Sequence, residues 1–443
     1  MLISIGNQWQ RYTIGYAYGY KPSKEHEGDP HYSIKSSYHQ LDDTTYGVLS
    51  GAAFTVSFSV FGIFGGALSD NVNRRFLMGI TAICWSVCTL LTGLINNFYI
   101  LFILRFLLGI FESSFNPCAY SVISDYFHPA HRGTASSIFN LGIYFGGALS
   151  SLAVIMIGSL GWRLTYDVIG IIGIASGILG LVLIKDPERG KFDTKNPIPL
   201  GEIKQVAERS VAQKFKDAAS EVLINPTCRW VTLAGSFRFF GGYAIGFFMP
   251  AYFQHNYSTY KDEYSIGNAF VVSLCGFCSA LSGGVISDRL EAKGNYMAKA
   301  YVCILGTALG VPTIMGCTLI QKNFWASLSM LGLEYLFAEC WIGPCITMLL
   351  NTISPENKGY GVSAFLFFCT ISGTISSAAL GAWVNTYDPK NNPKYYGYFI
   401  CGFVLFSYIG SLPFFVLAGR QYTAIKKAEA RARSQTGDLD NLK

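Results

Sequence analysis

Long apolar runs separated by short polar connections dominate this chain. Residues 48–68 and 76–104 contain no charged side chain, and residues 330–350 contain only Glu334 and Glu339. An apolar run of about 18 residues or more can cross roughly 30 Å of hydrocarbon as a helix. Since helices satisfy their own backbone groups in lipid and open sheets do not, the repeated runs predict an all-α membrane protein.

The runs predict twelve membrane helices. We place them at 1–20, 45–68, 76–96, 98–122, 135–158, 163–184, 228–253, 266–287, 298–320, 324–350, 360–385 and 396–418. The first is barely long enough and begins almost at its polar residues Asn7, Gln8, Gln10 and Arg11, so either the chain starts late or part of this helix is missing. It lacks the basic start and clean apolar core of a signal peptide.

One polar stretch divides the chain. Residues 185–227 form the predicted central loop, within which 202–222 can form an amphipathic surface helix. This loop separates a six-helix half at 1–184 from a second at 228–418, and a basic tail follows at 419–443.

The two halves also repeat each other in sequence. The end of the second span, Gly65-Gly66-Ala67-Leu68-Ser69-Asp70, shares four of six residues with Gly283-Gly284-Val285-Ile286-Ser287-Asp288, 218 positions later. Pro129, Arg132, Gly133 and Phe139 match Pro355, Lys358, Gly359 and Phe365 at an offset of 226. Two echoes at nearly equal offsets predict pseudo-symmetric halves, as in many secondary transporters with a midplane site.

Charge placement predicts the orientation. The chain is only 14% charged with a net charge of +6, and its basic residues lie between the apolar runs, so the charge does not indicate nucleic-acid binding. One side of the predicted membrane receives 22 Lys and Arg residues and the other eight, while Arg11, Arg105 and Arg238 lie within spans. The basic side faces the cytoplasm, which places both termini there, in a plasma or endolysosomal membrane.

A loop motif gives the first family resemblance. Residues 66–75 resemble the major facilitator motif Gly-x-Leu-x-Asp-x-x-Gly-Arg-Arg, with matches at Gly66, Leu68, Asp70, Arg74 and Arg75. Asn73 replaces the second glycine, and Asn tolerates a left-handed backbone. The resemblance implies the major facilitator fold and a gate, in which Asp70 pairs with arginines or a helix N-terminus. Asp288 is its counterpart in the second half.

Charged residues inside the fourth span are the main site candidates. Arg105 and Glu112 are seven residues apart and share a helical face, which Asn116 extends by another turn. A charge within the bilayer costs a few kcal/mol, so such residues are usually paired and functional. Together with Arg11 they predict a polar stripe along a central cavity for substrate binding and coupling.

The first half resembles the spinster branch, which is associated with lysophospholipids and sphingoid lipids. The matches cover roughly residues 9–185 and include Arg11-Tyr12-Thr13, Trp85-Ser86, Arg105, Gly109, Glu112-Ser113, Asp125, Phe127 and Arg132. The resemblance implies Arg11, Arg105 and Glu112 as the coupling and substrate-polarising set. The branch usually has aspartate before the first-span arginine; Gln10 here cannot titrate, so coupling rests on Glu112 or the protein is a uniporter.

The anion:cation symporters are an alternative resemblance. They share the Arg, Gly and Glu pattern of the fourth span, and Phe115-Asn116-Pro117 partly matches them. Arg11, Arg105 and Arg238 would then bind an organic anion. Glu334 and Glu339 are five residues apart and cannot share one face, so we expect one of them, Glu334, in the cavity.

The sequence therefore predicts a secondary active or facilitative transporter of an amphipathic lipid-like or organic anion substrate, with protons as a possible co-substrate. The alternatives are an anion:cation symporter for small anions and a non-transporting scaffold or sensor subunit. No phosphate-cradling loop, nucleophile–base set or metal-ligand spacing indicates an enzyme or a cofactor. The expected partners are a small-molecule or lipid substrate and membrane lipids, and the pattern predicts no oligomeric state.

Overall fold

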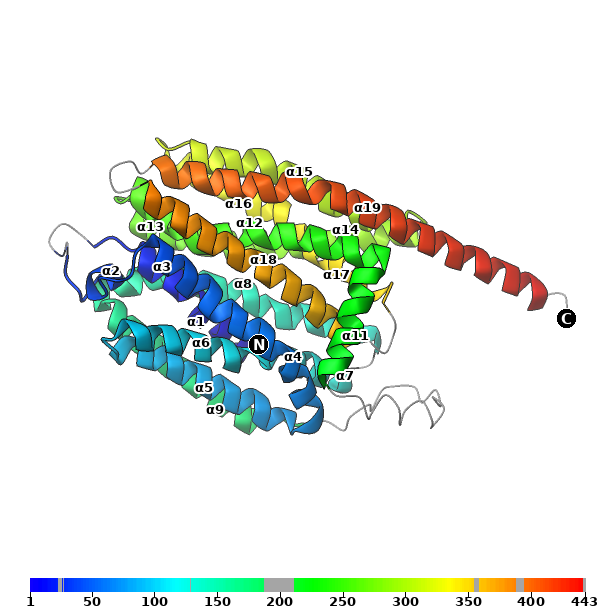
Figure 1. The fold of residues 1–443 in the computed structure, drawn as a ribbon, viewed down its shortest axis with the longest axis horizontal. Coiled ribbons are helices and arrows are strands. Elements are labelled where there is room, and N and C mark those ends of the chain that lie inside the picture. Colours follow the sequence, from blue (N-terminus) through cyan, green and yellow to red (C-terminus); the bar gives the residue numbers. More distant parts are fainter. Residues whose placement is uncertain are drawn as a thin grey trace.

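The computed structural model describes residues 1–22, 26, 28–127, 129–186, 211–353, 358–387 and 394–440. At some helical positions within these ranges, including 66 and 70, only the backbone is described. The described chain is helical, and its long helices run side by side along one axis of the molecule (Figure 1).

Six segments make up the first half of the bundle. They are α1 (Leu2–Gly19); α3 (Asp43–Gly47) continued by the π-helical η2 (Val48–Ala53) and α4 (Phe54–Asn71); α5 (Arg74–Leu94); α6 (Phe98–Ser113) continued by α7 (Phe115–Tyr126); α8 (Pro129–Leu160); and α9 (Trp162–Leu183). The short α2 (Ile34–Ser37) lies at one end of the bundle, which we call the α2 end (Figure 1).

Six further segments make up the second half. They are α12 (Pro226–Asn256); α13 (Lys261–Phe270) continued by the π-helical η3 (Val271–Gly276) and α14 (Phe277–Ala292); α15 (Ala298–Leu319); α16 (Phe324–Ala338) continued by the 3-10 turn η4 (Glu339–Trp341) and α17 (Ile342–Leu350); α18 (Lys358–Thr386); and α19 (Lys394–Asp440). Between the halves, α11 (Val211–Ile224) packs at the opposite, α11 end (Figure 1).

The all-helical prediction is confirmed, with two differences in extent. The last helix does not stop near residue 418 but continues to Asp440, so the basic tail extends the helix away from the bundle (Figure 1). The surface helix expected at 202–222 is α11, which begins at Val211; residues 201–210 lie outside the described residues.

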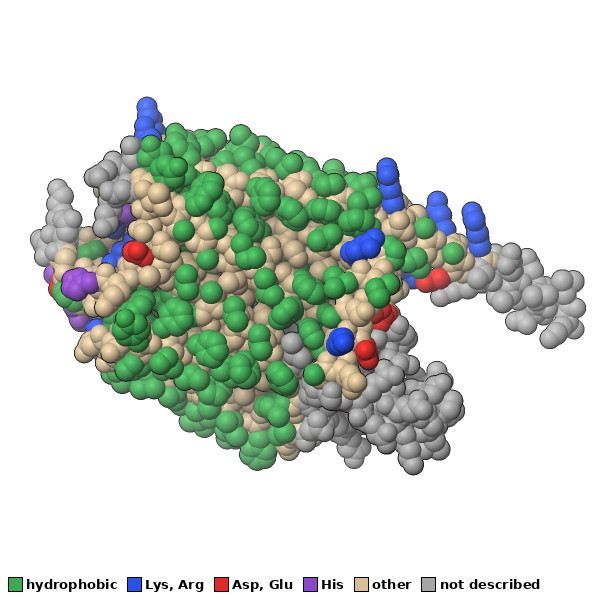
Figure 2. Space-filling view, viewed as in Figure 1, with side chains coloured by type: hydrophobic (Ala, Val, Ile, Leu, Met, Phe, Trp, Pro, Cys, Tyr) green, Lys and Arg blue, Asp and Glu red, His purple; other side chains and the backbone are tan. Residues whose placement is uncertain are grey.

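Ten of the twelve segments are long and apolar enough to cross a membrane. The other two, α1 and α12, carry buried polar residues such as Asn7, Gln10 and Arg238, which lower their hydropathy. Charged side chains gather at the two ends of the molecule and apolar ones cover the middle (Figure 2). This distribution is that of a multi-pass membrane protein.

Asparagine caps begin several of these helices. Asn97, Asn225 and Asn323 each accept backbone N–H groups of the first turn of α6, α12 and α16. Asn73 does the same for α5, accepting from the N–H of Arg75 at 3.0 Å. Its φ is −62°, so the motif's second glycine is replaced by a helix cap, and the left-handed turn considered for this position is not formed.

The sequence repeat is also a structural repeat. The π-helical segments η2 and η3 begin 223 positions apart, and each interrupts the second helix of its half. Within the halves, α1 packs on α8 as α12 packs on α18, and α5 packs on α9 as α15 packs on α19. Between the halves, α4 packs on α18 and α13 packs on α8. The arrangement is that of two pseudo-symmetric six-helix halves.

Backbone contacts close the bundle at its α2 end. A Cβ on Gly381 of α18 would lie 2.3 Å from the carbonyl oxygen of Asp43, and one on Gly47 would lie 2.5 Å from that of Ser377. Hydrogen bonds join the halves beside these contacts, from Tyr46 Oη to the Phe247 carbonyl at 2.8 Å and from Ser265 Oγ to the Ser151 carbonyl at 2.6 Å. Closure therefore depends on glycine where α3 crosses α18.

We expect Gly381→Ala to open the α2 end, because its methyl group cannot fit beside the backbone of Asp43. Hydrogen–deuterium exchange measured by mass spectrometry should rise in α3 and in the C-terminal part of α18. Gly402→Ala is the matched control, since nothing lies within 4 Å of a Cβ at that position of α19. Equal exchange in the two variants would contradict the role of the glycine contact.

Candidate functional site

Two arginines, Arg105 buried and Arg11 half-buried, lie beside one aromatic ring in the first half. The guanidinium carbon of Arg11 on α1 lies 4.5 Å from the centroid of Phe54, and that of Arg105 on α6 lies 5.5 Å from it. Arg105 donates to the backbone carbonyl of Arg11 and, at 3.5 Å, to that of Gln10. The π face of Phe54 and these carbonyls partly compensate two cations that burial has removed from water.

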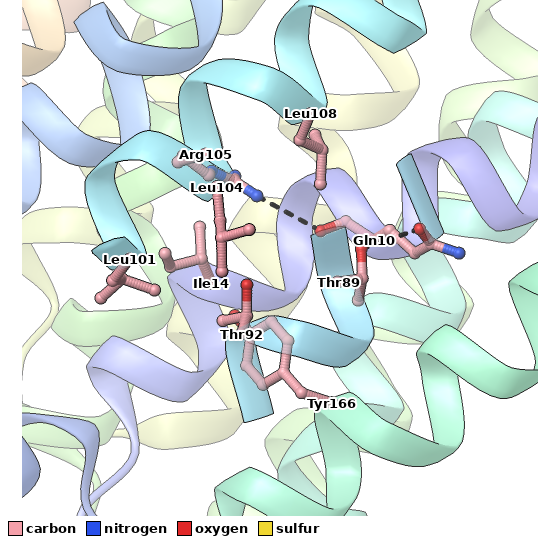
Figure 3. Close-up of a pocket in the computed structure, with 9 residues that line it drawn as sticks. All are labelled: Gln10, Ile14, Thr89, Thr92, Leu101, Leu104, Arg105, Leu108 and Tyr166. Carbon is pink, nitrogen blue, oxygen red and sulfur yellow. Dashed lines mark hydrogen bonds between the residues drawn. The ribbon is translucent and has the colours of Figure 1, made fainter. Parts of the chain in front are cut away.

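A small cavity lies against Arg105, between α1, α5, α6 and α9 (Figure 3). Gln10 faces it, with its amide nitrogen donating to Ser86 at 3.1 Å and its amide oxygen accepting from Thr89 at 2.8 Å. Both ends of the amide are therefore used in helix packing. Gln10 holds α1 against α5 and offers no ionisable group.

Glu112 is the carboxylate of this region, two residues before the break at Ser114 between α6 and α7. It is 1% exposed, and neither of its oxygens has a hydrogen-bond partner among the described residues. Arg11 and Arg105 act on it electrostatically, but neither lies within ion-pair distance. Arg105 and Glu112 thus lie buried on one side of α6, as their spacing predicted. With Arg11 they form a group of two cations and one acid that contains no ion pair.

One tyrosine connects this group to the second half. Tyr243 on α12 accepts a hydrogen bond from Arg11 at 3.0 Å and another from Thr55 of α4 at 3.5 Å. We call Arg11, Arg105, Glu112 and Tyr243 the central site. It lies where α1 meets α12, so a movement between the halves would change the surroundings of Arg11.

A second buried charge cluster lies in the second half. Arg238 on α12 donates to the Ala338 carbonyl at 2.7 Å, and its guanidinium carbon lies 3.9 Å from the ring centroid of Tyr408. Tyr408 in turn donates to Glu334, which is 1% exposed. Glu334 is thus held between α16 and α19, whereas Glu339 in η4 is only partly buried. We call these four residues, Arg238, Glu334, Glu339 and Tyr408, the second cluster.

Asn116 does not continue the face of Arg105 and Glu112. The helix breaks at Ser114 between α6 and α7, which rotates the residues that follow. Asn116 instead lines a separate groove toward the α11 end, with Ser59 and Gly62 of α4 on one side and Ser363 and Thr370 of α18 on the other. Ser59 and Thr370 share a hydrogen bond of 2.6 Å across this groove.

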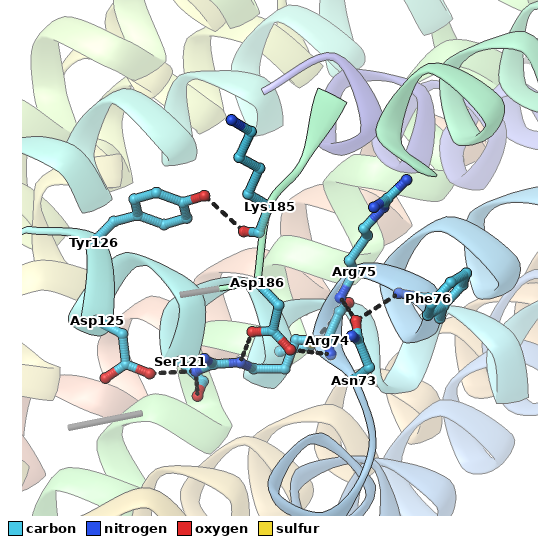
Figure 4. A network of polar contacts seen from close by, with 10 residues as sticks. Asn73, Arg74, Arg75, Phe76, Ser121, Asp125, Tyr126, Lys185 and Asp186 are labelled. Carbon is cyan, nitrogen blue, oxygen red and sulfur yellow. Dashed lines mark hydrogen bonds and ion pairs between the residues drawn. The ribbon is translucent and has the colours of Figure 1, made fainter. Parts of the chain in front are cut away.

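The motif arginine Arg74 is the centre of a polar network at the α11 end (Figure 4). It is 1% exposed, forms ion pairs with Asp125 of α7 and, at 2.8 Å, with Asp186 after α9, and donates to Ser121 at 3.0 Å. Arg75 donates to the carbonyl of Leu181 on α9. These partners lie on α7 and α9 or directly after α9, so in this conformation Arg74 and Arg75 connect the start of α5 to the ends of α7 and α9.

The second half has a buried lysine at the start of its third helix, and the acids that pair with it come from the end of α14. Lys299, at the start of α15, is 1% exposed and pairs with Asp288 at 2.5 Å and with Glu291 at 2.8 Å. Glu291 also accepts from Tyr422 of α19 at 2.6 Å. The motif residues Gly66 and Asp70 lie on α4, where their side-chain surroundings are outside the described part, so the predicted pairing of Asp70 stays a prediction.

Two residues of this region were not among the expected site residues. Tyr243 is one of 27 tyrosines, and only the crossing of α1 and α12 distinguishes it from the others. Glu339 follows Glu112 by 227 positions, as Arg238 follows Arg11. The internal repeat therefore indicated Glu339 as the counterpart of Glu112 in the second half.

Residues 2–377 match the family model described as Major Facilitator Superfamily. The chain is 29% identical over 368 residues to the probable galactarate/D-glucarate transporter GarP of Escherichia coli, covering 76% of this chain and 81% of that one. It is 22% identical over 346 residues to an MFS-type efflux pump of Mycolicibacterium smegmatis, covering 77% and 76%.

Solved structures share the fold. A bacterial homologue of the human lysosomal transporter Spinster, in an inward-facing and unoccupied conformation, superimposes with a TM-score of 0.70 at 20% identity, covering 96% of this chain and 94% of that one. The D-xylose-proton symporter gives a TM-score of 0.60 at 15% identity, covering 92% and 95%. The expected twelve-helix architecture is confirmed.

We expect Arg74→Gln to lower the free energy of unfolding by about 3 kcal/mol, because it leaves Asp125 and Asp186 without their shared buried cation. Unfolding of the purified protein by sodium dodecyl sulfate measures this change. Arg229→Gln removes an exposed arginine that stacks on Trp230 and should leave stability near that of the wild type. If the two variants unfold alike, the Arg74 network contributes little to stability.

Proposed function

This chain belongs to the Major Facilitator Superfamily and is a transmembrane transporter that works by alternating access, and we propose that its substrate is an organic anion bound at the central site. We assign the moving parts to residues 1–184 and 228–418, connected by residues 185–227. Substrate and coupling residues are then Arg11, Arg105 and Glu112 in the first half, with Arg238 in the second.

The observation that carries the proposal is the excess of buried positive charge. Arg11 and Arg105 share the ring of Phe54 and a single nearby acid, Glu112. Arg11 Nε and Arg105 Nε are buried without hydrogen-bond partners among the described residues. A carboxylate or similar anion would supply acceptors for these donors and neutralise the remaining charge.

The relatives support the same class of substrate. Galactarate, D-glucarate and hexuronate, which name several of them, are sugar acids with one or two carboxylates. A planar guanidinium binds a carboxylate through two parallel hydrogen bonds, which a lysine cannot reproduce. Two arginines beside the same aromatic ring therefore suit an anion better than a neutral sugar.

A lysolipid-like amphipath is the second candidate. The spinster homologue gives the higher TM-score of the two structures compared above, and Arg11-Tyr12-Thr13 resembles that branch. The groove between α4 and α18 is lined by Phe58, Leu366 and Phe367 as well as by Asn116, and these apolar side chains could contact an acyl chain. The phosphate group of the lysolipid would then bind Arg11 and Arg105.

The basic residues support an orientation. Arg74, Arg229 and Lys299 lie at the α11 end, whereas Lys35, Lys261 and Lys394 belong to the connections at the α2 end. With the excess of Lys and Arg facing the cytoplasm, the α11 end and both termini are cytoplasmic. The conformation described, closed at the α2 end, is then the one that is shut toward the outside.

We expect Arg11→Lys and Arg105→Lys each to abolish most uptake of D-glucarate into proteoliposomes, because an ammonium group keeps the charge but loses the bidentate geometry. Arg229→Lys, outside the site, should transport like the wild type. Parallel uptake of a lysophospholipid decides between the two substrate classes. If folded wild-type protein transports neither compound, the transport proposal for these substrates fails and the scaffold alternative gains support.

We expect Glu112→Gln to weaken the response of uptake to an imposed pH gradient, since glutamine keeps the shape of the side chain but cannot exchange a proton. Counterflow, in which labelled and unlabelled substrate exchange without net proton movement, should persist. Gradient-driven accumulation in this variant equal to that of the wild type would rule out coupling through Glu112.

A further inference from the structure

The second cluster is an internal copy of the central site. Arg238 follows Arg11, Glu339 follows Glu112 and Pro344 follows Pro117, each by 227 positions. The first members of these pairs lie on α1, α6 and α7, and the second members lie on α12, η4 and α17, which are the corresponding elements of the other half. The duplication therefore placed an arginine and a glutamate in both halves.

The local structure around the two glutamates is also repeated. Glu112 lies just before the break at Ser114, and Glu339 lies within the 3-10 turn that separates α16 from α17. Each break is crossed by a glycine of the neighbouring helix: a Cβ on Gly65 would lie 2.8 Å from Ser114 Cα, and one on Gly283 would lie 2.3 Å from the Cys340 carbonyl. Gly65 and Gly283 begin the two copies of the repeated motif.

The two acids of the second cluster have different surroundings. Glu334 accepts from Tyr408 and is 1% exposed, so it is part of the packing between α16 and α19. Glu339 is partly exposed and makes no hydrogen bond or ion pair with the other described residues. Arg238 is held at the base of the turn by the Ala338 carbonyl, and its Nε and Nη1 are buried without a hydrogen-bond partner among the described residues.

Glu339 lies near the central site, with Tyr12 between them. Tyr12 of α1 lies within electrostatic range of Glu339 and also of Arg11 and Glu112. The other titratable or charged groups that face Glu339 come from α8, α12, α16, α19 and its own turn: Tyr144, Arg238, Glu334, Tyr335, Tyr408 and Cys340. Arg238 is the one basic side chain among these and Glu334 the one acidic side chain, and Glu334 accepts a hydrogen bond from Tyr408.

We infer that Glu339 is a second proton-binding carboxylate of the translocation pathway, so that each half contributes one titrating acid beside one arginine. In the first half Gln10 is fixed by Ser86 and Thr89 and leaves Glu112 as the acid. In the second half Glu339 exchanges its proton with water in the pathway, and Arg238 stabilises its carboxylate form. The role in transport rests on the proposed function, whereas proton binding by Glu339 does not.

Infrared difference spectroscopy of the purified protein in lipid, between acidic and alkaline pH, tests proton binding without a substrate. A protonated carboxyl group has a C=O stretch separate from the carboxylate bands. Glu112→Gln and Glu339→Gln should each remove a different part of the carboxyl signal, and Glu334→Gln should remove neither of these parts. An unchanged spectrum in Glu339→Gln, from protein that elutes as a folded species, overturns the inference.

Transport of D-glucarate tests the coupling. A pH difference of about one unit is worth a tenfold concentration ratio for each coupled proton. With the membrane potential clamped at zero, Glu339→Gln should therefore accumulate about tenfold less substrate at steady state than the wild type, while counterflow is retained and Glu339→Asp restores accumulation. Equal accumulation in wild type and Glu339→Gln overturns the coupling role. Absence of glucarate transport in the wild type contradicts the proposed substrate and leaves the infrared result to decide proton binding.

Discussion

The burial of guanidinium groups in a bundle with an apolar outer surface is the constraint on which the rest of the structure depends. Such a cation is tolerated only if other helices supply carbonyl oxygens, aromatic faces or acids. Arg105 donates hydrogen bonds to backbone carbonyls of α1, and Arg11 donates to the hydroxyl of Tyr243. Arg238 donates to the Ala338 carbonyl, at the break between α16 and α17. Each arginine thereby fixes a helix–helix contact, and the contact of Arg11 with Tyr243 joins the two halves. The polar residues of these contacts belong largely to α1 and α12, which are the two long segments outside the set of apolar membrane spans.

Much of this could be predicted from the sequence because hydrophobic periodicity is local. The run lengths located the helices, and the spacing of Arg105 and Glu112 placed both on one buried face. The prediction failed where a helix breaks. Asn116 was assigned a face by counting along an unbroken helix, but the turn at Ser114 resets the count. Tyr243 was missed for a different reason, since a contact between residues 232 positions apart leaves no local pattern.

The repeat recovers part of what periodicity misses. An offset of 227 identifies Glu339 from Glu112 and Arg238 from Arg11 without any knowledge of helix faces. It succeeds because duplicated halves keep their breaks and their close glycine contacts, which are set by backbone packing, even when most side chains have diverged. Where the halves differ, as with Arg74 and Lys299, one feature persists: a buried cation at the start of the third helix forms ion pairs with acids of its own half, from α7 in the first half and from α14 in the second.

The types of bond within and between the halves differ in a way that suits a rocking movement. None of the ion pairs observed among the described residues joins one half to the other; Arg74 pairs with Asp125 within the first half and Lys299 with Glu291 within the second. Contacts across the halves are glycine crossings and hydrogen bonds with at least one neutral partner, such as Tyr46 with the Phe247 carbonyl. A neutral hydrogen bond contributes about 1 kcal/mol net, because water replaces it when it breaks. A buried ion pair that loses one partner costs several times as much. The halves can therefore separate at the α2 end at modest cost while each keeps its internal structure, which is the energetic requirement for alternating access.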